Sequence, residues 1–296
     1  AMVTDAGGTI LTAQDGVLAG PYREPHNQYQ QSAGSIHNDD VARPLGFRGG
    51  TVAGIIHHEQ FAPLLLRAFG RRWFEHGSLS LYYRNASTHS EKVKASLQLP
   101  AVDATDTQVD VWMDHENGLR VLEGTASVGA SPDATGLRRR FENRPAPGDV
   151  RILRHLPIGS LMPEVPVRVS REAQEGRRPV ITEPLEWYWG DSPWGGPICT
   201  PVTMFRLLNP AFTLRETITD VVGLYGGIEI RVVDGPLFVE RDYVAQGRLL
   251  EAGSTPKSEY LWWEAQLRDG DSTKVVAEML MMSRFMKGSS PLYAER

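Results

Sequence analysis

Residues 35–54 read SIHNDDVARPLGFRGGTVAG, and this stretch organises the rest of the chain. It places His37 beside Asp39 and Asp40, and it ends in a glycine-dense turn before a long amphipathic segment. A turn of this kind can hold a proton-transfer group close to backbone N–H donors at the start of a helix. The stretch therefore predicts the beginning of a helix and the strongest candidate for chemistry in the sequence.

Hydrophobic periodicity continues outward from this turn. Residues 55–69 carry apolar side chains at helical spacing, and Pro63 is expected to kink that helix. Alternating apolar and polar residues then predict strands at 78–83, 92–99, 109–113 and 121–128. The first half of the chain is therefore expected to be a helix followed by antiparallel strands.

The second half repeats this order. Gly195 and Gly196 open another apolar segment, as Gly49 and Gly50 do in the first half. Strands are expected after it at 228–233, 237–243, 244–250, 260–267 and 275–282. One unit used twice predicts an α+β protein in which a helix lies on a curved antiparallel sheet in each half. We expect an N-terminal unit at 1–130, a linker at 131–165 and a C-terminal unit at 166–296.

Composition excludes several classes of function. The 296 residues carry a net charge of −5 and no long basic block, which argues against a nucleic-acid partner. No apolar run approaches the roughly 18 residues of a membrane span, and the N-terminus lacks the pattern of a signal peptide. The single cysteine, Cys199, suits a reducing compartment. We expect a cytoplasmic protein, a monomer or homodimer, without a metal or cofactor.

The central stretch also resembles a known family. His37, the run from Ala42 to Phe47 and Val52-Ala53-Gly54 are similar to the signature of MaoC-like R-specific enoyl-CoA hydratases, which are hotdog-fold proteins. With the doubled helix-and-strand order, the resemblance implies a double hotdog. It also implies a hydro-lyase, a hydratase or dehydratase acting on an enoyl or 3-hydroxyacyl thioester carried by CoA or an acyl carrier protein.

The match departs from the family at functional positions. Ser32 stands where the family has an aspartate that shares a water with the histidine, and Ala53 replaces a histidine. The resemblance leaves His37 as the acid and base in turn, and the Gly54 N–H as the donor to an enolate-like oxygen. The candidate catalytic residues are thus His37, Asp39, Asp40 and Ser32. The candidate substrate-binding residues are Phe47, Gly50, Ala53 and Gly54.

Simpler interpretations stay open for the same residues. Asp39 or Asp40 could cap a short helix at 41–45, and His37 could be structural. The run His57-His58-Glu59 lacks the spacing of a metal site, because adjacent helical residues point about 100° apart, so helix polarity explains it better. The tryptophans of the second half fit core packing or an apolar substrate wall.

Two other functions remain as alternatives. One is a hotdog enzyme recruited to isomerisation, elimination or cyclisation of a bulky biosynthetic intermediate, which the missing aspartate and the aromatic second half favour. The other is a non-catalytic subunit that binds an acyl group.

Overall fold

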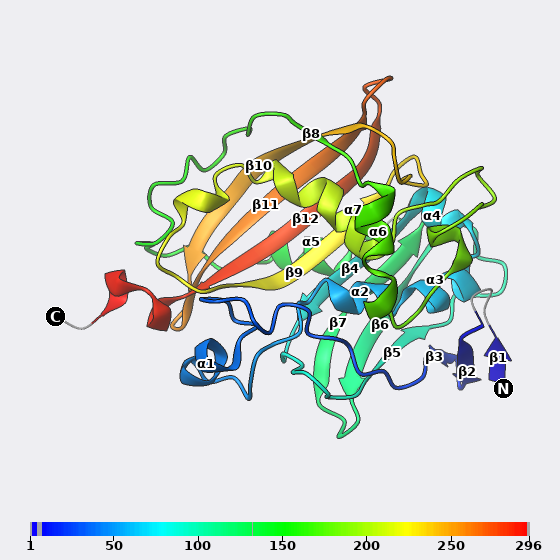
Figure 1. Ribbon diagram of the computed structural model, residues 1–296, viewed down its shortest axis with the longest axis horizontal. Coiled ribbons are helices and arrows are strands. Elements are labelled where there is room, and N and C mark those ends of the chain that lie inside the picture. The colour runs from blue at the N-terminus through cyan, green and yellow to red at the C-terminus, as the bar shows by residue number, and fades with distance from the viewer. Residues whose placement is uncertain (1, 5–7, 132, 295–296) are drawn as a thin grey trace.

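The computed structural model describes residues 2–4, 8–131 and 133–294. Its centre is a single curved sheet with the strand order β1-β2-β3-β5-β6-β7-β4-β9-β12-β11-β10-β8 (Figure 1). The strands are β1 (Met2–Thr4), β2 (Ile10–Gln14), β3 (Val17–Ala19), β4 (Gly77–Tyr83), β5 (Val93–Gln98), β6 (Thr107–His115), β7 (Arg120–Val128), β8 (Val165–Val167), β9 (Gly223–Val232), β10 (Tyr243–Ser254), β11 (Ser258–Asp269) and β12 (Val275–Met286).

The sheet consists of two halves with the same internal order. Strands β5-β6-β7-β4 in the first half correspond to β10-β11-β12-β9 in the second, and neighbours pair antiparallel. The halves join where β4 pairs antiparallel with β9, with Leu79 opposite Ile230 and Leu81 opposite Ile228. The predicted repeat is therefore confirmed. The domain bounds 1–130, 131–165 and 166–296 stay a proposal, because the two halves share one continuous sheet.

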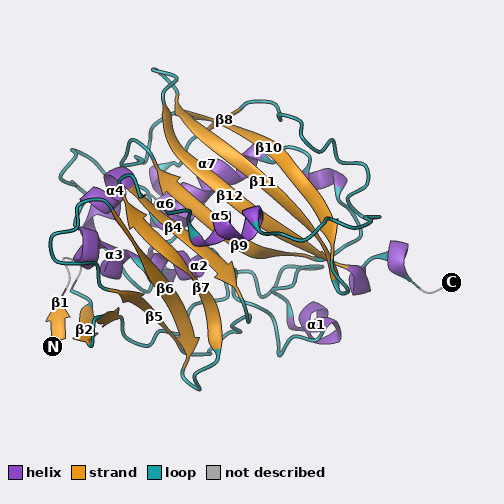
Figure 2. Ribbon diagram, turned by 180° about the vertical axis from the view of Figure 1, so that it is seen from behind, coloured by secondary structure: helices purple, strands orange, loops and turns teal. Residues whose placement is uncertain are grey.

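Helices cover both faces of the sheet. They are α1 (Asp39–Ala42), α2 (Ile56–Glu59), α3 (Ala62–Phe69), α4 (Arg72–His76), α5 (Gly136–Glu142), α6 (Arg171–Glu175) and α7 (Pro201–Leu208). Helices α2, α3 and α7 lie on one face, whereas α5 crosses the other (Figures 1 and 2). The predicted first helix is broken before Pro63 into α2 and α3, and the predicted linker contains α5.

The main core lies between the sheet and the helices α2, α3 and α7. Aromatic side chains of the two halves pack against each other here. The Phe74 ring of the first half lies 6.0 and 6.1 Å, between centroids, from the rings of Trp187 and Trp194 in the second. Trp187 and Trp194 of the second half therefore pack against the first half. A smaller apolar cluster, which includes Leu137, Tyr260 and Trp262, lies under α5.

One predicted strand is wrong. Residues 237–243 form a loop up to Asp242, and only Tyr243 belongs to a strand, β10. Leu237 and Val239 are buried all the same, because the loop bonds to the segment before α7 through the Cys199 and Pro197 backbones. These two bonds form an isolated antiparallel bridge between Ile198 and Phe238, so the predicted alternation is real but the pairing is too short to make a strand.

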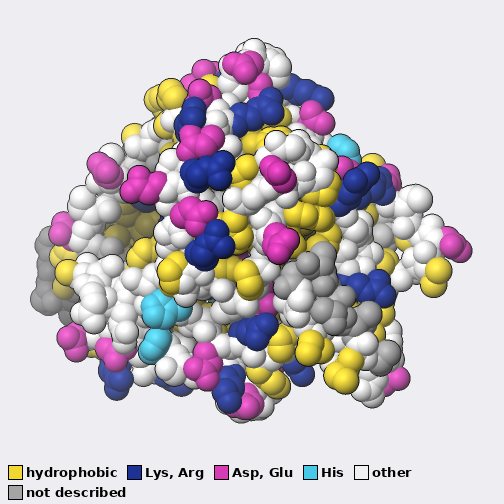
Figure 3. Space-filling view, turned by 45° about the vertical axis from the view of Figure 1, so that its right-hand side comes forward, with side chains coloured by type: hydrophobic (Ala, Val, Ile, Leu, Met, Phe, Trp, Pro, Cys, Tyr) yellow, Lys and Arg dark blue, Asp and Glu magenta, His cyan; other side chains and the backbone are white. Residues whose placement is uncertain are grey.

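The surface shows no segregation of charge on the face seen in Figure 3, where Lys and Arg side chains lie among Asp and Glu. Within the described residues, no helix combines the length and apolar character that crossing a bilayer requires.

Candidate functional site

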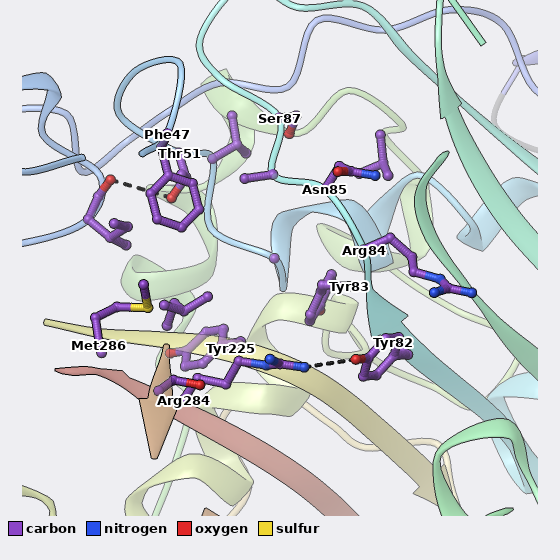
Figure 4. A pocket seen from close by; sticks show the side chains of 18 of the residues that line it. Phe47, Thr51, Tyr82, Tyr83, Arg84, Asn85, Ser87, Tyr225, Arg284 and Met286 are labelled. Atoms are coloured by element: carbon purple, nitrogen blue, oxygen red, sulfur yellow. Dashed lines mark hydrogen bonds between the residues drawn. The ribbon is translucent and has the colours of Figure 1, made fainter. Parts of the chain in front are cut away.

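A cavity of about 710 Å³ opens where the two halves of the sheet meet. Its walls come from the loop before α2, the end of β4 with the segment after it, the start of β9, the turn between β10 and β11, and the end of β12 (Figure 4). A volume of this size is typical of small-molecule sites. The described residues that line it include His37, Phe47, Thr51, Gly54, His57, Tyr82, Tyr83, Arg84, Asn85, Ser87, Tyr225, Lys257, Arg284 and Met286.

His37 lies at this cavity in a fixed orientation. Its Nδ1 is 2.6 Å from the carbonyl oxygen of Thr51. A carbonyl oxygen only accepts hydrogen bonds, so Nδ1 must carry the proton and Nε2 must hold the free lone pair of the neutral ring. Burial lowers the pKa of His37, with the Thr51 bond acting in the opposite direction. The imidazole is thus prepared as a proton acceptor at neutral pH.

The three predicted partners of His37 lie elsewhere. The Asp39 carboxylate accepts the Gly50 N–H at 2.6 Å and pairs with Arg43 at 3.2 Å. These contacts, the Gly50 bond first, lower the pKa of Asp39. Asp40 is exposed. Ser32 lies in a turn, where its backbone N–H donates to the Tyr29 carbonyl oxygen. None of Ser32, Asp39 and Asp40 is among the residues that line the cavity.

The capping prediction for Asp39 and Asp40 is wrong. Asn38 is the N-cap of α1, and its side chain accepts the Asp40 N–H at 2.9 Å. Helix α1 therefore begins at Asp39, two residues before the predicted start. The Asp39 carboxylate instead stabilises the glycine turn by accepting the Gly50 N–H.

The four predicted substrate contacts divide into two pairs. Phe47 and Gly54 line the cavity, whereas Gly50 and Ala53 are buried behind it. A Cβ on Gly50 would lie 2.1 Å from the His37 carbonyl oxygen, so only glycine lets these two segments approach. Gly50 thus supports the backbone of His37.

Gly54 faces the ring of Tyr83. A Cβ there would lie 2.6 Å from Tyr83 Cζ, and the Tyr83 hydroxyl is held by His58 Nε2 at 3.2 Å. We expect Gly54→Ala to push this ring and to lower stability by about 1–3 kcal/mol, as overpacking does. Urea denaturation measures this. Gly196→Ala, where a Cβ meets no heavy atom within 4 Å, is the matched control and should stay near wild type. Equal stability of both variants would contradict the packing.

The polar run at the start of the helix is buried, so helix polarity does not explain it. His57 Nε2 lies 2.8 Å from the Ser87 hydroxyl oxygen, and Ser87 also lines the cavity. Burial lowers the pKa of His57 to about 4 and that of His58 to about 3. Both rings are therefore neutral at pH 7. Across the described residues, no cluster of three His, Cys, Asp or Glu side chains suits a metal ion.

Sequence reasoning missed the residues that the second half contributes. Tyr225 comes from β9, Lys257 from the turn after β10, and Arg284 from β12. Lys257 and Arg284 make the lining cationic, since none of the described residues that line the cavity is Asp or Glu, whereas Arg84 pairs with Glu123 outside the lining. The sequence holds no local signal for this, because the lining runs from Ile36 to Met286 and includes contacts such as the hydrogen bond from Arg284 to Tyr82, 202 positions apart.

The fold has clear counterparts among solved structures. No protein-family model matches the chain, and no curated protein matches its sequence. A protein described as a MaoC domain dehydratase from Chloroflexus aurantiacus superposes with a TM-score of 0.56 at 12% identity, over 90% of this chain and 93% of its own. The dehydratase domain of PpsC from Mycobacterium tuberculosis, solved with C12:1-CoA, gives 0.51 at 11% identity, over 96% of this chain and 100% of the domain.

A further Mycobacterium tuberculosis protein, described as a double hotdog, gives a TM-score of 0.50 at 13% identity over 87% of this chain and 89% of its own. At these identities the likeness concerns the fold alone. Together with the duplicated strand order and the helix on each half-sheet, it confirms the expected architecture. This chain has the α+β double-hotdog fold that is seen in MaoC-like dehydratases.

Proposed function

We propose that this protein is a hydratase or dehydratase that acts on an enoyl or 3-hydroxyacyl thioester, with His37 as its acid–base group. One observation carries the proposal: His37 is held through Nδ1 at a cavity that Gly54 also lines. Within the described part of the chain, neither His37 Nε2 nor the Gly54 N–H has a hydrogen-bond partner. A base and an oxyanion donor therefore share one cavity with their reactive atoms unused.

This arrangement suits an elimination that one base completes. In the dehydration direction, His37 Nε2 removes the α-proton of a 3-hydroxyacyl thioester, and the electron pair moves to the thioester oxygen. The Gly54 N–H stabilises the enolate-like oxygen. The electrons then form the α,β double bond while the β-carbon–oxygen bond breaks, and the proton returns from His37 to the leaving hydroxyl as water. Hydration is the reverse, so His37 serves as base and acid in turn.

The cationic lining supports a carrier that bears phosphate. Lys257 and Arg284 line a cavity whose described lining has no carboxylate, in a protein of net charge −5, whereas Arg84 pairs with Glu123 outside it. Both CoA and the phosphopantetheine arm of a carrier protein bring phosphate to the mouth of such a site. The fold neighbour solved with C12:1-CoA is consistent with this carrier chemistry.

A direct assay tests the proposal. Crotonyl-CoA and longer enoyl-CoA substrates should lose the absorbance of the enoyl thioester as water adds, and 3-hydroxyacyl-CoA should gain it. Absence of turnover for every chain length in both directions would contradict the proposal. Thioester binding without turnover would then identify a non-catalytic acyl-binding subunit.

A second candidate reaction rests on the same histidine. No carboxylate lies beside His37 among the residues that line the cavity, and the family's aspartate position is Ser32. One base with an oxyanion donor also suffices to move a double bond, which begins with the same α- or γ-proton abstraction. If enoyl thioesters exchange α- or γ-protons with deuterated solvent but add no water, an isomerase is the better assignment.

A further inference from the structure

A second cavity, of about 840 Å³, lies on the face of the sheet that carries α5. It reaches from β5 and β6 across β7 and β4 to β11 and β12, and the end of α5 with the residues after it forms its outer wall. We call it the α5 groove. Its described lining includes Tyr82, Trp112, Arg120, Glu123, Arg139, Arg140, Arg144, Tyr260, Trp262 and Arg284.

Aromatic rings form the floor of the α5 groove. Trp112 comes from β6, Tyr82 from β4, and Tyr260 and Trp262 from β11. Tyr260 is only 6% exposed, and its hydroxyl has no hydrogen-bond partner among the described residues. That hydroxyl lies against Gly253, where a Cβ would be 2.2 Å from it, so it faces β10 and not the open groove. Trp262 is 3% exposed and packs on Phe141 at 5.2 Å between ring centroids, so the half-buried Trp112 is the ring that offers a stacking surface to a planar heterocycle.

Arginines surround this floor. Five of the described lining residues are arginines, whereas only Asp110 and Glu123 are acidic. The Glu123 carboxylate is shared, because it pairs with Arg84 at 2.9 Å and with Arg140 at 2.7 Å. Arg120 and Arg144 are paired as well, with Asp114 and Glu251. Arg139 and Arg284 make no ion pair in the described part of the chain, and Arg284 donates instead to the Tyr82 hydroxyl at 2.8 Å. Arginine forks of this kind bind phosphate groups in pairs of hydrogen bonds.

The α5 groove continues from the cavity that holds His37. Tyr82, Thr255 and Arg284 line both cavities, and the Arg284–Tyr82 hydrogen bond lies at their border (Figure 4). Arg140 stacks on the outer side of this border, with its guanidinium carbon 3.8 Å from the Tyr82 ring centroid. An extended ligand could therefore place its reactive end beside His37 and its anionic end among the arginines.

We propose that the α5 groove binds the nucleotide end of coenzyme A, with the adenine on Trp112 and the phosphates on Arg140 and Arg284. The proposal rests on the proposed function, in which the first cavity holds the acyl thioester. It selects CoA over a carrier protein, because a phosphopantetheine arm carries no adenine and would leave the aromatic floor empty.

Calorimetry with adenosine 3′,5′-bisphosphate tests the groove without any turnover. The wild-type protein should bind this nucleotide, and affinity should fall as salt screens the arginines. Arg140→Gln and Trp112→Leu should each weaken binding by about tenfold or more, since they remove a charge-assisted bond or a stacking surface. Neither residue lines the first cavity. Arg71→Gln, an exposed arginine near the opposite end of β4, is the control and should bind like wild type.

Two outcomes would refute the proposal that the α5 groove binds a nucleotide. One is that the nucleotide does not bind, and the other is that it binds equally well to wild type, Arg140→Gln and Trp112→Leu. Comparing KM for an acyl-CoA with that for the pantetheine thioester of the same acyl group separates this failure from failure of the proposed function. If both thioesters are turned over with equal KM, the proposal that the α5 groove binds the nucleotide is refuted, while the proposed hydratase function still holds. Nucleotide binding that depends on Arg140, with no turnover of any thioester, supports the groove and refutes the reaction.

Discussion

Replacing Arg177 with methionine is expected to lower the free energy of unfolding by about 3–5 kcal/mol. The Arg177 and Glu59 side chains are 2% and 3% exposed and pair at 3.0 Å. Burial raises the pKa of Glu59, and the charge of Arg177 is the largest effect that opposes this. Removing the guanidinium alone would leave a buried carboxylate without its counter-ion. Urea denaturation followed by tryptophan fluorescence measures the loss.

The size of this effect follows from where the pair lies. Glu59 ends α2 in the first half, and Arg177 follows α6 in the second. The Glu59 carboxylate also accepts the hydroxyl of Thr200 at 3.0 Å, and Thr200 is the N-cap of α7. Arg177 reaches back to Gln28 at 2.6 Å. One buried network therefore connects α2 of the first half with α7 of the second. Loss of the Arg177 charge disturbs the packing of both helices.

A double variant separates loss of the pair from loss of packing. Glu59→Leu together with Arg177→Met removes both charges and keeps apolar volume, so it should be considerably more stable than Arg177→Met alone. An Arg177→Met protein within about 1 kcal/mol of wild type would contradict the buried network. So would a double variant less stable than the single one.

The fold was largely predictable because its signals are local. The strands β5, β6 and β7 alternate apolar and polar residues over their own lengths, and the paired Gly-Gly turns mark two helix starts. Pro63 correctly predicted a broken helix for the same reason. The failure at 237–243 is instructive, since Leu237 and Val239 alternate in burial around a single antiparallel bridge from Phe238 to Ile198. An alternating pattern of burial does not reveal whether the pairing extends beyond one bridge.

Only part of the site was predictable, because the other part is assembled from residues that are distant in the sequence. His37 and Gly54 belong to one local stretch, and the sequence points to both. Tyr225 and Arg284 reach the cavity only because β4 pairs with β9, which no spacing in the sequence encodes. Likewise, His57 is a polar residue whose burial beside Ser87 depends on the segment after β4. Asp39 was adjacent to His37 in sequence, yet the turn directs its carboxylate to Gly50.

Replacing His37 with alanine is expected to lower kcat/KM on the enoyl thioester by about 10²–10⁴-fold, the usual contribution of a general acid–base group. His37 Nε2 is the atom proposed to accept and return the proton, and alanine offers no substitute. The free energy of unfolding should change far less, because the half-buried ring contacts only Thr51 and the Tyr29 ring among the described residues. His155→Gln, an exposed histidine that contacts Thr217 in the second half, is the matched control. Equal rates for His37→Ala and wild type would refute the role of His37.

The pH dependence of the wild-type enzyme gives an independent check on the same residue. The reaction begins with neutral His37, and burial holds its pKa below the ordinary 6.5. As the pH falls, the ring becomes protonated and loses its lone pair, so kcat/KM should fall with a midpoint below 6.5. No substitution of the Thr51 side chain removes the hydrogen bond at His37 Nδ1, because Thr51 accepts it through its backbone carbonyl. Since that bond favours the protonated ring, the midpoint reports the balance between burial and Thr51. A midpoint above 6.5 would mean that a neighbouring negative charge outweighs burial, and the absence of a carboxylate among the described cavity residues argues against it.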